Sequence, residues 1–340
     1  MDKSVLASTA QALVPSGRGI LAADESLRST ERRFAKYAVP HTPENRNAYR
    51  DMMFTTPGLE EFISGVIFFD ESIRQSAHDG VPFPKFLQGK GIIAGIKVDA
   101  GFVDLPLYPG EKITEGLDGL RERLIEYRGL GARFAKWRAV LIIGDGLPSR
   151  YCMQANARAL ARYAAMCQEQ DLVPIVEPDV QLAGMHSLER CEEVTTAALN
   201  YTFEALYEAN IYLEGMLLKP NMVLSGKSAP VQASVEEVAA ATLRTLKRTV
   251  PAAVPGIVFL SGGQGAVPAT AHLNAMVKTG NYPWQLSFSY LRALADPAFD
   301  VWQGKAENFA AAQKVFYNRA KLTAAARKGE YSEAMEKELA

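Results

Sequence analysis

The chain has 340 residues, of which 48% are hydrophobic and 22% charged, a balance typical of a soluble globular protein. Its formal net charge of −1 gives no indication of binding to nucleic acid or to a membrane surface. The 3 cysteines have no CxxC spacing and the 4 histidines are scattered, which excludes a disulfide framework or a metal-ligand motif. The N-terminal residues lack the apolar core of a secretory or transit peptide, so a cytoplasmic protein is expected.

Eight short apolar runs predict eight β-strands. Most are rich in Val, Ile, Leu or Phe and few have a wholly polar face, which is typical of parallel strands covered on both sides. The predicted strands are 19–23, 65–69, 92–98, 134–141, 173–177, 213–219, 256–261 and 285–290.

Most intervals between these strands have a helical pattern. Thr42 and Pro43 are an N-cap and a first-turn proline, which predict a helix over 44–54. Further helices are predicted over 116–129, 156–170, 188–209 and 235–249.

The stretch 251–277 has no charged residue and is long enough to imitate a membrane span. Three prolines and the pair Gly262-Gly263 interrupt it, so a buried strand followed by a glycine-rich loop is expected instead.

Strands alternating with helices predict an α/β fold, a TIM (β/α)8 barrel. The alternative is a doubly wound open sheet, but no Gly-x-Gly-x-x-Gly follows the first strand, which disfavours its dinucleotide-binding form. No linker divides the chain, so we expect a single domain over 1–340. An extra N-terminal helix precedes the barrel, a helical tail begins near Gly304, and the polar segment 327–340 is expected to be mobile.

Polar residues recur where the predicted strands end. Lys219 ends the apolar run 212–218, although a lysine is almost never buried without a partner. A single residue of this kind is usually a solvated strand end. Recurrence at the same end of several strands favours a functional site instead, because these ends meet at one mouth of a barrel. The other members are Asp24, Lys97, Lys136, Arg138, Glu177, Ser261, Gly262, Gly263, Ser289 and Arg292.

Lys219 can act as an amine nucleophile if its pKa falls well below the ordinary value of about 10.4. Burial and a neighbouring cation, for which Lys136 is the candidate, lower an amine pKa. A neutral lysine can attack a ketone to form a Schiff base, and the iminium is an electron sink that allows a carbon–carbon bond to break without a metal. Glu177 and Asp24 are candidates for the proton transfers.

Phosphate recognition is also predicted. Ser261-Gly262-Gly263 supplies a hydroxyl and closely spaced backbone N–H groups after the seventh strand, and Arg292 follows the eighth. Lys97, Arg138 and Arg33 are candidates for a second phosphate.

Together these segments resemble class I fructose-bisphosphate aldolase, the Schiff-base type. The matching motifs are 19–26, 95–99, 134–138, 173–178, 217–223 and 259–264, within a similarity that runs from about Gly17 to Ala326. The resemblance implies that Lys219 forms the imine and that Glu177 is the acid/base of carbinolamine chemistry. It implies that Asp24 and Lys136 orient the substrate and handle protons.

The same resemblance assigns the phosphates. It places Ser29, Arg33 and Lys97 at the phosphate far from Lys219. The near-phosphate site consists of Ser261, Gly262, Ser289 and Arg292. The remaining substrate-binding positions are Ser26, Arg138, Leu260 and Gly263.

The implied reaction is reversible cleavage of fructose 1,6-bisphosphate to dihydroxyacetone phosphate and glyceraldehyde 3-phosphate, in glycolysis or gluconeogenesis. No metal and no cofactor are implied besides the covalent imine with Lys219. The implied partner is a phosphorylated sugar, and many relatives are tetramers. Neither a nucleic acid nor a membrane is expected as a partner.

Three departures from the family pattern stand out. Asp179 replaces a frequent glutamate, and Leu291 replaces the glycine of Ser-Tyr-Gly-Arg. Animal relatives end in a tyrosine, whereas this chain ends in Ala340 and offers Tyr331 as a candidate. Two alternatives stay open: a Schiff-base aldolase that prefers a sugar monophosphate, and a non-catalytic scaffold that keeps the fold.

Overall fold

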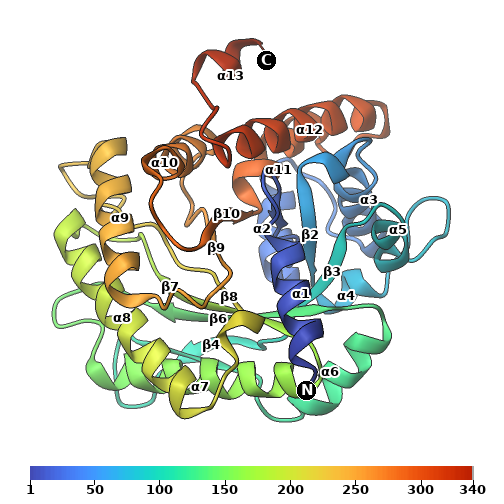
Figure 1. Cartoon of the computed structure of the whole chain (residues 1–340). Helices are drawn as coiled ribbons and strands as arrows, with labels where there is room; N and C mark the ends of the chain where they lie inside the picture. Colours follow the sequence, from blue (N-terminus) through green and yellow to red (C-terminus); the bar gives the residue numbers. More distant parts are fainter. Residues whose placement is uncertain (339–340) are drawn as a thin grey trace.

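Eight parallel strands close into a barrel in the computed structural model, which describes residues 1–338 (Figure 1). Around the barrel the order is β1-β10-β9-β8-β7-β6-β3-β2. The strands are β1 (Gly19–Leu21), β2 (Ile63–Phe68), β3 (Ile93–Lys97), β6 (Phe134–Leu141), β7 (Val173–Val180), β8 (Leu217–Leu218), β9 (Gly256–Phe259) and β10 (Gln285–Tyr290). The predicted TIM barrel is confirmed.

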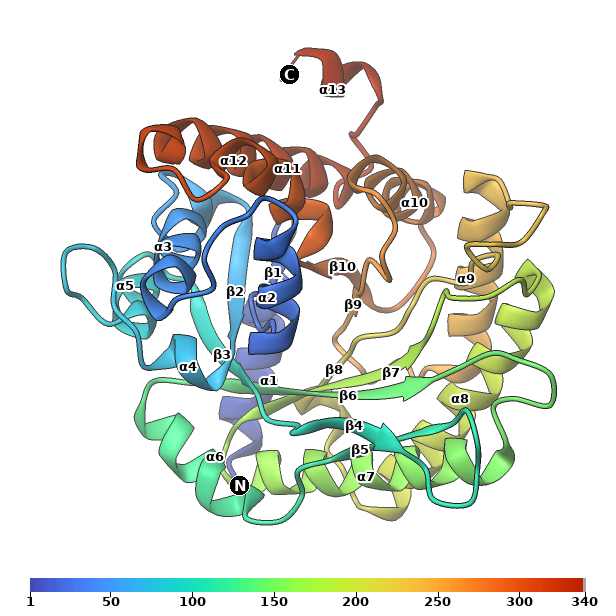
Figure 2. The same ribbon diagram turned by 180° about the vertical axis from the view of Figure 1, so that it is seen from behind.

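Helices surround the barrel on the outside (Figures 1 and 2). They are α1 (Lys3–Leu13), α2 (Leu27–Ala35), α3 (Pro43–Phe54), α4 (Asp70–Ile73), α5 (Phe83–Gly89), α6 (Leu120–Gly129), α7 (Arg150–Glu169), α8 (Leu188–Glu208), α9 (Val235–Thr249), α10 (Ala266–Thr279), α11 (Arg292–Trp302), α12 (Phe309–Ala326) and α13 (Ala334–Glu338). The predicted cap of α3 is present, because the Thr42 hydroxyl accepts from the backbone N–H of Asn45. Within residues 1–338, no helix combines the length and apolarity that a membrane crossing requires.

The start of the predicted strand 213–219 is wrong. Leu213–Gly215 is a short 3₁₀ helix, η2, and only Leu217–Leu218 pairs as β8. The amide of Gln168 explains the difference. Its Nε2 donates to the carbonyls of Tyr212 and Gly215, and its Oε1 accepts from the Tyr212 N–H, so these backbone groups are satisfied outside the sheet.

A two-stranded antiparallel hairpin was not predicted. β4 (Gly101–Asp104) pairs with β5 (Lys112–Glu115); they come between β3 and α6 in the sequence, and in space they lie between β6 and α7 (Figure 2). The hairpin follows the carboxyl end of β3, so it lies at the same end of the barrel as the predicted site.

The extra N-terminal helix closes the opposite end of the barrel. Leu6, Ala10, Leu13 and Val14 pack in one buried cluster with inward side chains of the strands, among them Phe134. An apolar plug therefore fills most of the amino-terminal half of the barrel interior, and the charged side chains of the predicted site lie at its carboxyl end.

The segment after α12 begins with anchored residues. The buried Arg327 donates to the carbonyls of Arg18, Val14 and Leu286, and the buried Tyr331 hydroxyl donates to Glu336. The mobility of 327–340 stays a prediction. Residues 339–340, and with them the terminal Ala340, lie outside the described residues.

We expect Gly95→Ala to destabilise the barrel. A Cβ at Gly95 would overlap the ring of Phe134, its partner across β3 and β6. The substitution therefore overpacks the plug and lowers the free energy of unfolding by about 1–3 kcal/mol. Gly129→Ala at the end of α6 meets no neighbouring atom within 4 Å and is the matched control, expected to be neutral or stabilising by up to about 1 kcal/mol. Urea unfolding of both variants measures the difference. Equal stability of the two would contradict the overpacking.

Candidate active site

The alternation of side chains along β6 directs two predicted residues inward. Trp137 stacks on Tyr163 of α7, with ring centroids 5.6 Å apart, so it faces the helices. Its neighbours Lys136 and Arg138 therefore face the barrel interior, as the sequence predicts. β7 continues to Val180, which places Glu177 and Asp179 on one face.

Four charged side chains form one buried cluster at the carboxyl end of the barrel. Lys136 Nζ lies 2.6 Å from Asp24 Oδ2 and 3.3 Å from Glu177 Oε2. Glu177 Oε1 in turn lies 3.5 Å from Lys219 Nζ. The structure thus brings together the four residues that the sequence singles out for catalysis, with two positive and two negative charges.

One oxygen of this cluster has an ion pair but no hydrogen-bond partner. Glu177 Oε2 is buried and accepts no hydrogen bond from any of residues 1–338, although Lys136 Nζ is near. A buried acceptor that lacks a partner is costly unless a ligand supplies one. A substrate hydroxyl or a leaving water between the two lysines would satisfy it.

The surroundings shift the pKa values of the two lysines in opposite directions. Burial lowers the pKa of Lys219 and outweighs Glu177, which acts to raise it, while Lys136 and Arg138 add to the lowering. Burial also disfavours the charged form of Lys136, but Asp24 and Glu177 reverse this and raise its pKa above the ordinary value. Lys219 is therefore the amine that loses its proton first, and Lys136 stays a cation.

Asp24 is held ionised. Burial by itself would raise its pKa, but the opposite charges of Lys136, Lys219 and Lys97 lower it below the ordinary value. The cluster therefore favours the carboxylate form of Asp24 beside the charged form of Lys136.

A candidate anion site follows β9. Gly262 and Gly263 have φ angles of +60° and +82°, a left-handed pair that glycine adopts without strain. A Cβ at Gly263 would lie 2.8 Å from Lys227 Nζ and 3.0 Å from Arg292 Nη1. Neither cation is in an ion pair with any of residues 1–338.

Lys227 is a site residue that the sequence reasoning missed. The available signal was a lysine in the loop after the strand that ends in Lys219, eight positions further on. Near these cations, the buried Ser289 Oγ on β10 lacks a hydrogen-bond partner within residues 1–338, and Ser261 and Leu260 are both buried. The predicted near-phosphate residues Ser261, Gly262 and Arg292 thus follow β9 and β10 as expected.

The cations predicted for the second phosphate are each paired with a carboxylate. Lys97 Nζ lies 2.6 Å from Asp99, and Arg138 Nη2 lies 2.6 Å from Asp179. Arg33 binds Glu25 and also Asp296 of α11, a residue that no sequence signal marked. Ser26 caps α2, and its hydroxyl lies 3.2 Å from that of Ser29.

Two departures from the family pattern have a structural account. Leu291 has a φ of −119°, so the backbone before α11 does not require glycine. Asp179 reaches Arg138 and the amide of Gln181 at 2.7 Å despite its shorter side chain.

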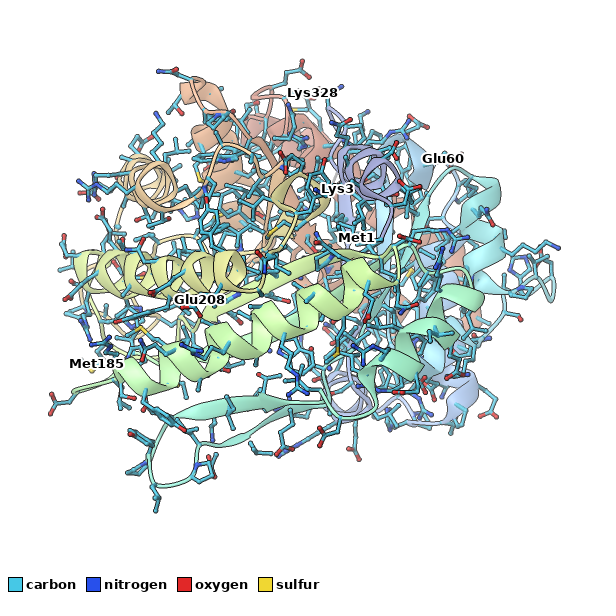
Figure 3. All side chains as sticks on the ribbon, turned by 60° about the horizontal axis from the view of Figure 1, so that its bottom comes forward. Met1, Lys3, Glu60, Met185, Glu208 and Lys328 are labelled. Atoms are coloured by element: carbon cyan, nitrogen blue, oxygen red, sulfur yellow. The ribbon has the colours of Figure 1, made fainter. Side chains whose placement is uncertain are left out.

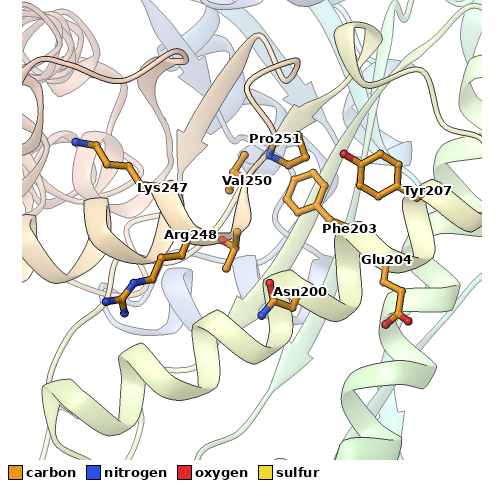
Figure 4. Close-up of a pocket in the computed structure, with 9 residues that line it drawn as sticks. Asn200, Phe203, Glu204, Tyr207, Lys247, Arg248, Val250 and Pro251 are labelled. Carbon is orange, nitrogen blue, oxygen red and sulfur yellow. The ribbon is translucent and has the colours of Figure 1, made fainter.

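Other surface features lie away from this cluster. Charged side chains such as Lys3, Glu208 and Lys328 cover the outside (Figure 3). A groove between α8 and the end of α9 is lined by Phe203, Tyr207 and Arg248 among others (Figure 4). These helices run opposite to the strands, so their carboxyl ends lie at the closed end of the barrel. Within residues 1–338, no group of three or more His, Cys, Asp or Glu is placed to hold a metal ion.

The fold and the cluster define a β/α barrel with a buried amine among carboxylates at its carboxyl end. A sequence model of the family "fructose-bisphosphate aldolase class-I" matches residues 5–340. The chain is 56% identical to a "probable fructose-bisphosphate aldolase class 1" of Xanthomonas axonopodis pv. citri, over 97% of this chain and 99% of that one. It is 50% identical to the muscle-type fructose-bisphosphate aldolase of Lethenteron camtschaticum, over 97% and 92% of the two chains.

A solved structure agrees with this. The fructose-bisphosphate aldolase of Plasmodium falciparum, crystallised with TRAP and a small-molecule inhibitor, superposes with a TM-score of 0.96 and 48% identity, over 98% of this chain and 97% of that one. The chain belongs to the class I fructose-bisphosphate aldolase family and is an aldolase, a carbon–carbon lyase. The resemblance carried by its motifs is confirmed.

We expect Lys136→Met to raise the pKa of Lys219, because the Lys136 cation helps to lower it. Labelling with an amine reagent across a pH series, read at Lys219 by mass spectrometry, locates the pH of half-labelling. That pH should move upward in Lys136→Met and stay near the wild-type value in Lys136→Arg, which keeps the charge. A downward or absent shift in Lys136→Met would show that Lys136 does not tune this amine.

Proposed function

We propose that this chain reversibly cleaves fructose 1,6-bisphosphate into dihydroxyacetone phosphate and glyceraldehyde 3-phosphate through an imine at Lys219, without a metal. The observation that carries the proposal is the buried Lys219 amine, whose pKa is lowered, beside Glu177 and Lys136. Membership in the class I family supports the same reaction.

The neutral Lys219 amine attacks the ketone carbon of the sugar and forms a carbinolamine. Glu177, which holds the proton that the Lys219 ammonium gave up, passes it to the carbinolamine hydroxyl. The hydroxyl leaves as water, the carbinolamine becomes a charged iminium, and Glu177 is again a carboxylate. Glu177 suits this step because one oxygen faces Lys219 and the other is ion-paired with Lys136 but has no hydrogen-bond partner.

Cleavage requires removal of a proton from the hydroxyl on the sugar carbon two positions from the iminium carbon. The carboxylate of Glu177, or that of Asp24, takes this proton, the carbon–carbon bond breaks, and its electrons move into the iminium to give an enamine. Lys136 holds both carboxylates in place by its two ion pairs. Protonation of the enamine and hydrolysis then release dihydroxyacetone phosphate and restore Lys219.

The phosphates fix the sugar in this position. In the proposal Ser261, Gly262, Gly263, Ser289 and Arg292 bind the near phosphate, with Lys227 as an additional cation. The far phosphate meets Ser29, Arg33 and Lys97, while Ser26, Arg138 and Leu260 complete the substrate contacts. The proposal also includes a cytoplasmic location and a homo-oligomeric assembly. Light scattering of the purified chain would measure the number of subunits in the assembly.

We expect borohydride to trap dihydroxyacetone phosphate on Lys219. Reduction of the imine gives a stable secondary amine, located by peptide mass spectrometry, and Lys219→Met should give neither adduct nor activity. Activity should persist in the presence of a chelator. An adduct on a different lysine, or loss of activity with the chelator, would contradict the proposal.

We expect Glu177→Gln to lower kcat by about 10²–10⁴-fold, because an amide cannot transfer the protons of carbinolamine dehydration. Steady-state kinetics on fructose 1,6-bisphosphate measures the loss. Glu192→Gln, which removes a carboxylate paired with Arg244 on the outer helices, is the control and should leave kcat unchanged. A Glu177→Gln variant with near-normal kcat would remove Glu177 from the mechanism.

A further inference from the structure

Two carboxylates from different parts of the chain share the guanidinium of Arg33. Glu25 accepts from Arg33 Nε at 3.1 Å and from Nη2 at 3.0 Å. Asp296, on the second turn of α11, accepts from Nη1. Arg33 thus links the loop after β1 to α11, whose first residue is Arg292.

Aromatic rings hold this guanidinium in a fixed position. Its central carbon lies 5.8 Å from the ring centroids of both Tyr49 and Phe299, and Phe34 packs on Phe299 at 5.5 Å. The Arg33 side chain is only 11% exposed. Because the guanidinium of Arg33 is held in place, a phosphate can bind it only by replacing one of its carboxylate partners.

The two carboxylates differ in how firmly they are held. Glu25 is 16% exposed and makes the bidentate contact, whereas Asp296 is 45% exposed and contacts a single nitrogen. One cation between two anions leaves a net negative charge at this point. Asp296 is therefore the partner that an incoming phosphate displaces from Arg33.

We propose that Asp296 sets the selectivity of the site by competing with the far phosphate of the sugar for Arg33. This inference rests on the proposed function, in which Arg33 contacts that phosphate. Asp296 weakens the advantage of a bisphosphate over a monophosphate that lacks the far group, such as fructose 1-phosphate. It lies one helical turn after Arg292, so α11 carries both the near-phosphate arginine and this competitor.

The test is Asp296→Asn, which removes the charge and keeps the shape. The ratio of kcat/KM for fructose 1,6-bisphosphate to that for fructose 1-phosphate is expected to rise roughly three- to fivefold, the scale of an exposed ion pair. The rise should come from a lower KM for the bisphosphate, with little change in its kcat. An unchanged or reduced ratio overturns the proposal, and a reduced ratio would mean that Asp296 positions Arg33 for binding.

Two matched variants separate this effect from general charge removal. Asp300→Asn, four residues further along α11, breaks a more exposed pair with Lys36 and should leave the ratio unchanged. In an Arg33→Met background, Asp296→Asn should no longer raise the ratio. A rise in either case overturns the proposal. Borohydride trapping at Lys219 in the Asp296→Asn variant reports separately on the proposed function, because dihydroxyacetone phosphate lacks the far phosphate.

Discussion

The chain of ion pairs from Asp24 through Lys136 and Glu177 to Lys219 is the constraint on which the site depends. Four charges are buried there, and the loss of one partner from a buried pair costs about 3–5 kcal/mol because it leaves a charge uncompensated. The members come from β6, β7 and the segments after β8 and β1. β1 lies across the barrel from β6, separated from it by β2 and β3. Only a closed barrel brings all four together, so the apolar plug of α1 supports the chemistry at the other end.

The same geometry assigns different roles to two chemically identical lysines. Lys136 has two carboxylates within 3.3 Å, whereas Lys219 has a single carboxylate oxygen at 3.5 Å. Because both are buried, the number of anions decides which amine keeps its proton. Lys136 stays charged and holds the acids, and its charge helps to make Lys219 the neutral nucleophile. Nucleophile and electrostatic anchor are therefore one coupled unit.

The sequence predicts the barrel, and it predicts that the four charged residues lie at one end of it, because both depend on local patterns. Strand ends can be read from apolar runs, and alternation fixes that Lys136 and Arg138 share a face. The sequence predicts a strand where η2 lies, because an apolar run does not reveal that the side-chain amide of Gln168 forms hydrogen bonds with the backbone of this segment. Lys227 and Asp296 were missed for a related reason. Their roles come from contacts with Gly263 and Arg33 across the fold, which no local pattern encodes.

The two proposed phosphate-binding ends of the site differ in whether their cations are already paired with carboxylates. Near Gly263 the cations Lys227 and Arg292 form no ion pair within residues 1–338, so an anion there gains their charge without displacing a carboxylate. At the far end Arg33, Lys97 and Arg138 are each already neutralised. Binding there exchanges one anion for another, and the net gain is the small difference between two similar interactions. In the proposed mechanism the near end therefore supplies affinity for any phosphorylated ketone, whereas discrimination between substrates depends on the carboxylates of the far end.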